Sequence, residues 1–218
     1  MKVIIAVANS KGGVGKSTVA VNLACCLLGS GYDVLIVDAD PQGSAMRWRS
    51  LAPDGLKLPT VIGIPKPILH HPDQLPKISF SYSFTIIDCP PALNDITRSA
   101  LRTANIAIMP VTPSPFDLWS GLDMLGAIRE IKPLNQKLTA YLLVSRKIPN
   151  TVLGRQVREA LAEYQQPILE TEICQRIALA EAALTGKGIM QYEPKSEAAR
   201  EFETLTEEVL RICRKNQT

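Results

Sequence analysis

Short apolar runs alternate with longer helical stretches along most of this chain. Apolar runs that predict strands lie at residues 3–8, 34–38, 84–88, 106–111 and 139–145. Several are apolar at nearly every position, which is typical of strands buried on both faces of a parallel sheet. Helices are predicted between them at residues 17–31, 115–131 and 149–166. This order predicts an α/β fold with a doubly wound, mostly parallel sheet.

Residues 51–80 break the pattern, because they are rich in proline and weakly periodic. The stretch "TVIGI" at residues 60–64 predicts a short strand, and the rest reads as a connector. Neither an internal repeat nor a second domain is visible. We therefore expect a single domain over residues 1–218, without an N-terminal helix-turn-helix module.

Composition narrows the class of protein. A chain of 218 residues, 46% of them hydrophobic, is long enough to bury a substantial core. No apolar run approaches the roughly 20 residues of a membrane helix, and the chain enters a strand pattern at once, unlike a signal peptide. The five cysteines form no CxxC pair, which favours a reducing, cytoplasmic setting. His70 and His71 have no ligand partners at metal spacing, so we expect a surface loop there.

A glycine-rich segment, "NSKGGVGKST" at residues 9–18, joins the first predicted strand to the first predicted helix. Such a loop presents backbone N–H groups and a helix N-terminus to a phosphate chain. Gly12, Gly13, Val14 and Gly15 would form the turn, Lys16 would contact the β- and γ-phosphates, Ser17 would bind Mg²⁺, and Thr18 would lie near the α-phosphate. The alternative is a glycine turn with two solvated lysines. Ser10 stands where a strict loop has glycine, and a second lysine, Lys11, opens the run.

Carboxylates follow two of the predicted strands. Asp88 ends "FTIID", the pattern in which a carboxylate holds the metal of a magnesium nucleotide site. Asp38 and Asp40 follow another strand, at the edge of the sheet where ligands bind. A solvated turn would also explain this pair. Beside a phosphate loop we favour function, with Asp40 orienting the attacking water.

Four motifs occur together and in order: "KGGVGKST", "VDADPQGS", "IIDCPP" and "MPVTPSPFDL". With them the chain closely resembles the ParA/MinD family of deviant Walker-box ATPases, over nearly its whole length. It is most similar to the small ParA proteins that lack an N-terminal DNA-binding module. The resemblance implies a single ParA-like P-loop ATPase domain that uses ATP and Mg²⁺.

The resemblance also implies a role for each candidate residue. Lys11 would be the family's signature lysine, which reaches the nucleotide of the other subunit in a sandwich dimer. A cation delivered in trans would make charge neutralisation depend on dimer formation. Asp40 would position or activate water, while Ser17 and Asp88 would hold Mg²⁺. The segment after "PVTPSP" and the "SRKIPN" turn, which includes Arg146, would lie near the adenine.

The family divides by the surface on which the dimer acts. The C-terminal helix has an apolar stripe of Phe202, Leu205, Val209 and Ile212, which we expect to pack on the sheet. Its polar face carries Glu201, Glu203, Glu207 and Glu208, which anionic lipid would repel. We therefore expect no membrane binding but non-specific DNA binding. The candidate phosphate contacts, each of which could equally be a solvated charge, are Arg176, Lys187, Lys195, Arg200, Arg211, Arg214 and Lys215.

These features predict a nucleoid-associated ATPase that positions cargo. ATP would favour a homodimer bound to DNA, and a cargo-associated adaptor, ParB-like or equivalent, would stimulate hydrolysis. The cargo could be a plasmid, a chromosome or a protein assembly such as a carboxysome. Two alternatives remain: a MinD-like membrane ATPase and a metabolic ATP-dependent ligase of the dethiobiotin synthetase-like class, which would not need Lys11. An iron-sulfur reductase relative is rejected, because only Cys89 lies near a suitable position.

Overall fold

The computed structural model of the protein describes residues 2–216, apart from the side chains of residues 115–122. Its centre is a seven-stranded sheet in the order β3-β2-β4-β1-β5-β6-β7. Each neighbouring pair is parallel, so the predicted α/β class with a mostly parallel sheet is confirmed. The strands are β1 Val3–Val7, β2 Val34–Asp38, β3 Thr60–Gly63, β4 Phe84–Asp88, β5 Ile106–Val111, β6 Thr139–Lys147 and β7 Ile168–Cys174.

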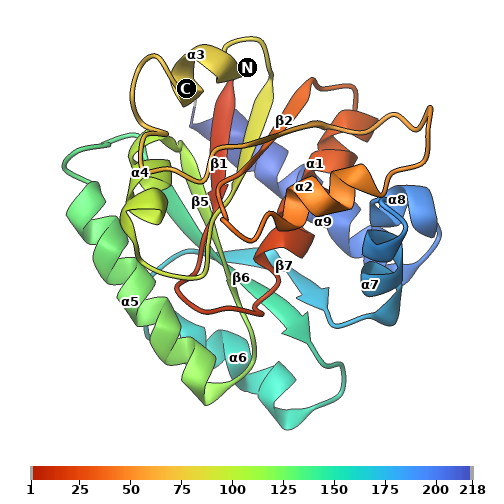
Figure 1. Ribbon diagram of the computed structural model, residues 1–218. Coiled ribbons are helices and arrows are strands. Elements are labelled where there is room, and N and C mark those ends of the chain that lie inside the picture. Colours follow the sequence, from red (N-terminus) through yellow and green to blue (C-terminus); the bar gives the residue numbers. More distant parts are fainter. Residues whose placement is uncertain (1, 217–218) are drawn as a thin grey trace.

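Helices cover both faces of the sheet (Figure 1). They are α1 Lys16–Gly29, α2 Ser44–Ser50, α3 Leu75–Ser79, α4 Asp95–Thr103, α5 Pro115–Ile131, α6 Val152–Ala162, α7 Ile177–Leu184, α8 Ile189–Tyr192 and α9 Glu197–Lys215. Buried residues of α1, α2, α7, α8 and α9 share one core, and those of α4, α5 and α6 share the other. Within residues 2–216, no helix is both long enough and apolar enough to cross a membrane.

Successive residues of the central strands enter opposite cores. Ile5 and Val7 of β1 belong to the core under α1, whereas Ala6 belongs to the core under α4 and α5. The alternation follows from the two-residue repeat of a strand. It explains why these strands read as apolar at every position, because both of their faces are covered.

The sequence missed several elements. The edge strand β7 alternates buried and partly exposed positions and includes Glu170 and Glu172, so it lacks a continuous apolar run. The helices α2, α3, α4, α7 and α8 are short and were not predicted. The predicted helix 149–166 narrows to Val152–Ala162, and the predicted strand 139–145 extends to Lys147. "TVIGI" does form a short strand, β3.

The C-terminal helix α9 packs on the sheet as predicted, with Phe202 and Leu205 fully buried. The expected glutamate face is wrong in part, however. Glu208 is buried and accepts hydrogen bonds from the backbone N–H groups of Glu170 and Thr171 and from the Thr171 hydroxyl. It satisfies donors of β7, which is an edge strand, and therefore joins helix to sheet instead of facing solvent.

Candidate nucleotide site

The glycine loop follows β1, the central strand, and ends at the first turn of α1. Gly13 and Gly15 have φ angles of 77° and 92°, in the left-handed region that favours glycine. A Cβ on Gly15 would also lie 2.9 Å from the Ser145 hydroxyl. Val14 is buried, so this residue anchors the loop with its side chain and can offer a ligand only its backbone. The sequence therefore folds locally into a tight cradle at a helix N-terminus.

The two lysines of the loop face different spaces. Lys16 is largely buried, and its Nζ donates a hydrogen bond to the backbone carbonyl of Lys11 at 2.7 Å. Burial lowers the pKa of Lys16, and the nearby Asp88 carboxylate opposes this shift. Lys16 lines the larger cavity described below, whereas Lys11 lines a second hollow that adjoins it.

Asp88 ends β4 beside the loop, in register with Val7 of β1 and Asp38 of β2. It is fully buried, and among the described residues neither of its carboxylate oxygens has a hydrogen-bond partner. Burial raises its pKa to about 7, and the nearby Ser17 hydroxyl and Lys16 ammonium act in the opposite direction. A buried carboxylate with unsatisfied oxygens is costly unless a ligand completes it. Asp88 therefore fits a site for a hard cation such as Mg²⁺.

Asp38 and Asp40 differ in their surroundings. Asp38 is buried and accepts hydrogen bonds from the backbone N–H groups of Asp40 at 3.2 Å and Met46 at 2.9 Å. Burial raises its pKa, and these backbone hydrogen bonds oppose the shift. Asp40 is partly exposed and lines the cavity. Asp38 thus organises the turn, and Asp40 is the carboxylate available to a ligand or water.

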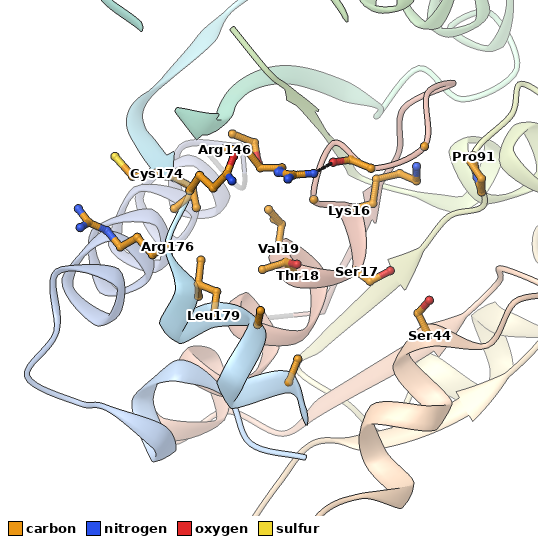
Figure 2. Close-up of a pocket in the computed structure, with 18 of the residues that line it drawn as sticks. Lys16, Ser17, Thr18, Val19, Ser44, Pro91, Arg146, Cys174, Arg176 and Leu179 are labelled. Carbon is orange, nitrogen blue, oxygen red and sulfur yellow. Dashed lines mark hydrogen bonds between the residues drawn. The ribbon is translucent and has the colours of Figure 1, made fainter. Parts of the chain in front are cut away.

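Lys16, Ser17 and Asp40 line one cavity of about 650 Å³, within the usual range for ligand sites, whereas the buried Asp38 and Asp88 are not among its lining residues. Its floor is the loop from Gly12 to Thr18, and Asp40 and Ser44 close one side. Figure 2 shows Ser17 and Ser44 facing each other across this part of the cavity. The opposite wall is apolar and comes from β7 and α7, with Ile173, Ile177, Leu179, Ala180 and Ala183. This wall was not predicted, although the alternation of "ILETEIC" could have revealed the strand β7 that carries part of it.

A second hollow, of about 420 Å³, adjoins the larger cavity and shares Gly12, Gly13, Arg146 and Gln175 with it. Lys11 lines it together with Thr112, Pro113 and the segment after β6. Three apolar side chains of that segment are more than half exposed: Ile148, Val152 and Leu153. Lys11 therefore shares this hollow with two exposed apolar side chains, Ile148 and Leu153.

Arg146 stands between the two hollows and lines both. Its guanidinium donates a hydrogen bond to the Gly13 carbonyl (Figure 2), and its φ angle of 53° is unusual for a non-glycine residue. The structure thus shows it holding the loop, and its expected place near the adenine stays a prediction. The other segment expected there begins at Pro115, and the side chains of residues 115–122 lie outside the described ones.

The predicted DNA contacts differ in their surroundings. Arg176 makes ion pairs with Glu197 and Glu201, and its side chain points away from Lys16 and Ser17 in Figure 2. Arg211 lies 3.8 Å from Glu170. Lys187 is half-buried, and its carbonyl accepts a hydrogen bond from Trp48. Lys195 and Arg200 are exposed at the start of α9, and Arg214 and Lys215 are exposed at its end.

Comparison with known proteins agrees with this geometry. Residues 5–189 match the family model of the CobQ/CobB/MinD/ParA nucleotide binding domain. The chain is 29% identical to "Maintenance of carboxysome distribution protein A" of Halothiobacillus neapolitanus, over 94% of this chain and 95% of that protein. It is 32% identical to the chromosome-partitioning ATPase Soj of Thermus thermophilus, over 94% of each.

Among solved structures, the septum site-determining protein MinD from Pyrococcus horikoshii, complexed with Mg-ADP, superposes with a TM-score of 0.76. The alignment covers 99% of each chain at 23% identity, so this likeness shows the fold. The chain therefore belongs to the CobQ/CobB/MinD/ParA nucleotide-binding family, as a ParA/MinD-like ATPase of partition or positioning that uses ATP and Mg²⁺.

Proposed function

We propose that this ATPase is a nucleotide-dependent positioning switch. ATP favours a sandwich dimer that binds nucleoid DNA without sequence preference, and a cargo-bound adaptor, ParB-like or equivalent, stimulates hydrolysis and releases the dimer. The relatives named for chromosome partitioning and carboxysome distribution suggest a chromosome, a plasmid or a carboxysome-like assembly as cargo.

The observation that carries this proposal is that the two lysines of the glycine loop, Lys11 and Lys16, line different hollows. Lys16 lines the cavity that would hold the nucleotide of its own subunit, but Lys11 lines only the adjoining hollow. The exposed Ile148, Val152 and Leu153 around that hollow supply apolar surface for a second copy. In such a dimer Lys11 would deliver its charge to the phosphates held by the partner subunit.

The remaining roles follow from burial and position. Ser17 and the unsatisfied carboxylate of Asp88 would hold Mg²⁺, which neutralises phosphate charge when bound. Gly12, Gly13 and Gly15 allow the backbone to approach the phosphates, and Thr18 lies one residue further along the cavity floor. Asp40, partly exposed at the same cavity, would orient the attacking water.

DNA is favoured over a membrane as the surface on which the dimer acts. The apolar stripe of α9 is packed in the core, so this helix offers no apolar face to lipid. The exposed cations that remain can make phosphate contacts, which suffice for weak, salt-sensitive DNA binding.

Retention of the protein on duplex DNA, measured with ATP, ADP and no nucleotide, tests the proposal. We expect retention with ATP to exceed the other two clearly, together with a dimer detected by light scattering. Equal retention in all three states contradicts the switch. A chain that stays monomeric in ATP and retains no DNA favours a metabolic ligase, and ATP-dependent flotation with liposomes favours a MinD-like role.

A further inference from the structure

Basic side chains gather at the edge of the sheet where the strands begin, away from the glycine loop. We call Lys2, Lys137, Arg214 and Lys215 the basic pole. A hollow of about 420 Å³ is lined by Lys2 and Lys137 and by Cys213 and Asn216, which flank Arg214 and Lys215 at the end of α9. Figure 1 shows both chain ends beside α3 at this edge of the molecule. The pole is therefore built from segments far apart in the sequence.

The centre of this edge carries no acidic residue. The segments that lead into β1, β5 and β6 contain Lys2, Lys132 and Lys137 but neither Asp nor Glu within the described residues. The acidic residues nearest in the chain order are Glu130, which lies in the last turn of α5 and pairs with Arg98, and Asp33 and Glu163, which precede the flanking strands β2 and β7. Among the described side chains, no ion pair involves Lys2, Lys137 or Arg214. The positive charges of Lys2, Lys137 and Arg214 are thus not compensated by an ion pair among the described side chains.

The chemistry of the pole fits a phosphate backbone better than a lipid surface. The exposed aromatic ring at this edge, Phe80, is 70% exposed, but the ammonium of Lys2 lies 2.9 Å from the ring centroid. A ring face occupied by a cation is not free to insert into a bilayer. Exposed lysines that are spread around a polar hollow suit contacts to successive phosphates, which need charge and not apolar surface.

We propose that the basic pole is the surface with which this protein contacts the sugar–phosphate backbone of DNA, an assignment that rests on the proposed function. The pole lies at the opposite end of the strands from Lys11 and the larger cavity, so a dimer closed over the nucleotide leaves it open. Two poles per dimer can then bind two segments of one long DNA molecule, and ATP strengthens DNA binding through this avidity without rebuilding either surface. Because the poles point away from each other, one dimer can bridge two duplex segments.

Two variants with the same change in net charge test this assignment. The pole variant is Lys2→Glu/Lys137→Glu, and the matched control is Lys195→Glu/Arg200→Glu at the other end of α9. That helix has 19 residues and spans about 28 Å. Binding of a labelled random-sequence duplex is measured with ATP across a salt series, and thermal melting and light scattering of the same samples verify folding and dimerisation.

We expect the pole variant to bind DNA at least about tenfold more weakly than the wild type, with a salt slope shallower by about 2 to 4, while the control loses much less. The assignment is overturned if the pole variant binds DNA as tightly as the wild type, or if the control variant loses as much DNA affinity as the pole variant. Either result leaves the proposed function standing. A wild-type chain without ATP-dependent DNA binding contradicts the function itself. Binding to phosphatidylglycerol vesicles in place of DNA also overturns the assignment.

Discussion

The Nζ of Lys16 donates a hydrogen bond to the backbone carbonyl of Lys11, so the two lysines of the loop are tied together at 2.7 Å. A phosphate oxygen and this carbonyl are alternative acceptors for the same ammonium. Nucleotide binding would therefore move Lys16 from its own loop to the phosphates. The backbone at Lys11 would lose a partner at the same moment, which links occupation of the cavity to the residue that faces the second hollow.

Lys16→Ala should abolish ATP binding without harming the fold, because Lys16 is a buried cation whose pKa burial lowers. In thermal melting, the variant should match the wild type when no nucleotide is present. Saturating ATP at about 100 times the Kd stabilises the wild type by about 2.7 kcal/mol, and this gain should vanish in the variant. A variant that ATP still stabilises would show that Lys16 is not needed for binding.

Lys11→Ala should keep ATP binding but lower ATP turnover by about 100-fold or more, because the dimer loses a cation at the transferring phosphoryl group. A mixture of two inactive variants tests delivery in trans. In a mixed dimer, the Lys11→Ala subunit holds ATP and the Lys16→Ala subunit contributes an intact Lys11. Turnover should therefore return on mixing. If the mixture is as inactive as its parts, Lys11 does not act across the interface.

Asp40→Ala should preserve ATP binding and trap the dimer, because the variant loses the carboxylate that we assign to the attacking water. Light scattering should show a dimer that persists over a time course in which the wild type returns to monomer. The neighbouring Asp38 gives no such test, since it holds the turn through backbone hydrogen bonds. A monomeric Asp40→Ala protein in ATP counts against this assignment.

Asp88 makes stability depend on pH in a defined direction. Its pKa is raised from 3.8 to about 7, so between these values the folded chain keeps a proton that the unfolded chain has released. Stability without nucleotide should fall as pH rises from about 4 to 7 and then level off. Asp88→Asn should remove this part of the slope and be more stable than the wild type at pH 8, by up to about 4 kcal/mol.

The matched control for Asp88 is Asp73→Asn, since Asp73 is an exposed carboxylate in the connector. Chemical denaturation at pH 4, 6 and 8 separates the two variants. If the free energy of unfolding changed with pH in the same way for the wild type and for Asp88→Asn, Asp88 would already be ionised over this pH range without nucleotide.

Glu208→Ala should destabilise the protein by about 2 to 4 kcal/mol, because it leaves the backbone N–H groups of Glu170 and Thr171 and the Thr171 hydroxyl without their acceptor. Glu207→Ala, one residue earlier and exposed, should change stability by about 0.5 kcal/mol or less. Urea denaturation of both variants checks this. Equal losses would mean that the buried carboxylate adds nothing to the junction of α9 and β7.

The sequence predicted secondary structure best for the elements that are buried on both sides. The central strands and α1 are apolar throughout, and the glycine loop and Asp88 follow from their places at strand ends. The sequence could not reveal β7, because an edge strand carries charged residues such as Glu170 and Glu172 on its outer positions. The apolar wall of the cavity was missed with it.

Glu208 shows a second limit of sequence reasoning. Helical periodicity placed it on the polar face with Glu207, and its charge favoured solvent. In the structure the Glu208 side chain is long enough to reach backbone donors at the edge of β7. One of these donors belongs to Thr171, which is 37 residues away in the sequence. Such long-range pairing between a side chain and a backbone leaves no local pattern. The same holds for Arg176, whose ion pairs with Glu197 and Glu201 require that β7 and α9 lie together.

The nineteen residues of α9 are a rigid rod between two distant regions of the molecule. Near its start, Glu197 and Glu201 form ion pairs with Arg176, which lines the larger cavity. The last turn of α9 carries Arg214 and Lys215. Between these ends Phe202, Leu205 and Val209 are buried in the core. A chain truncated before α9 would lose the hydrogen bonds from β7 to Glu208, the buried side chains that α9 adds to one core, and two of the four residues of the basic pole. The C-terminal helix is thus an integral part of the folded domain, and we expect its removal to unfold the protein.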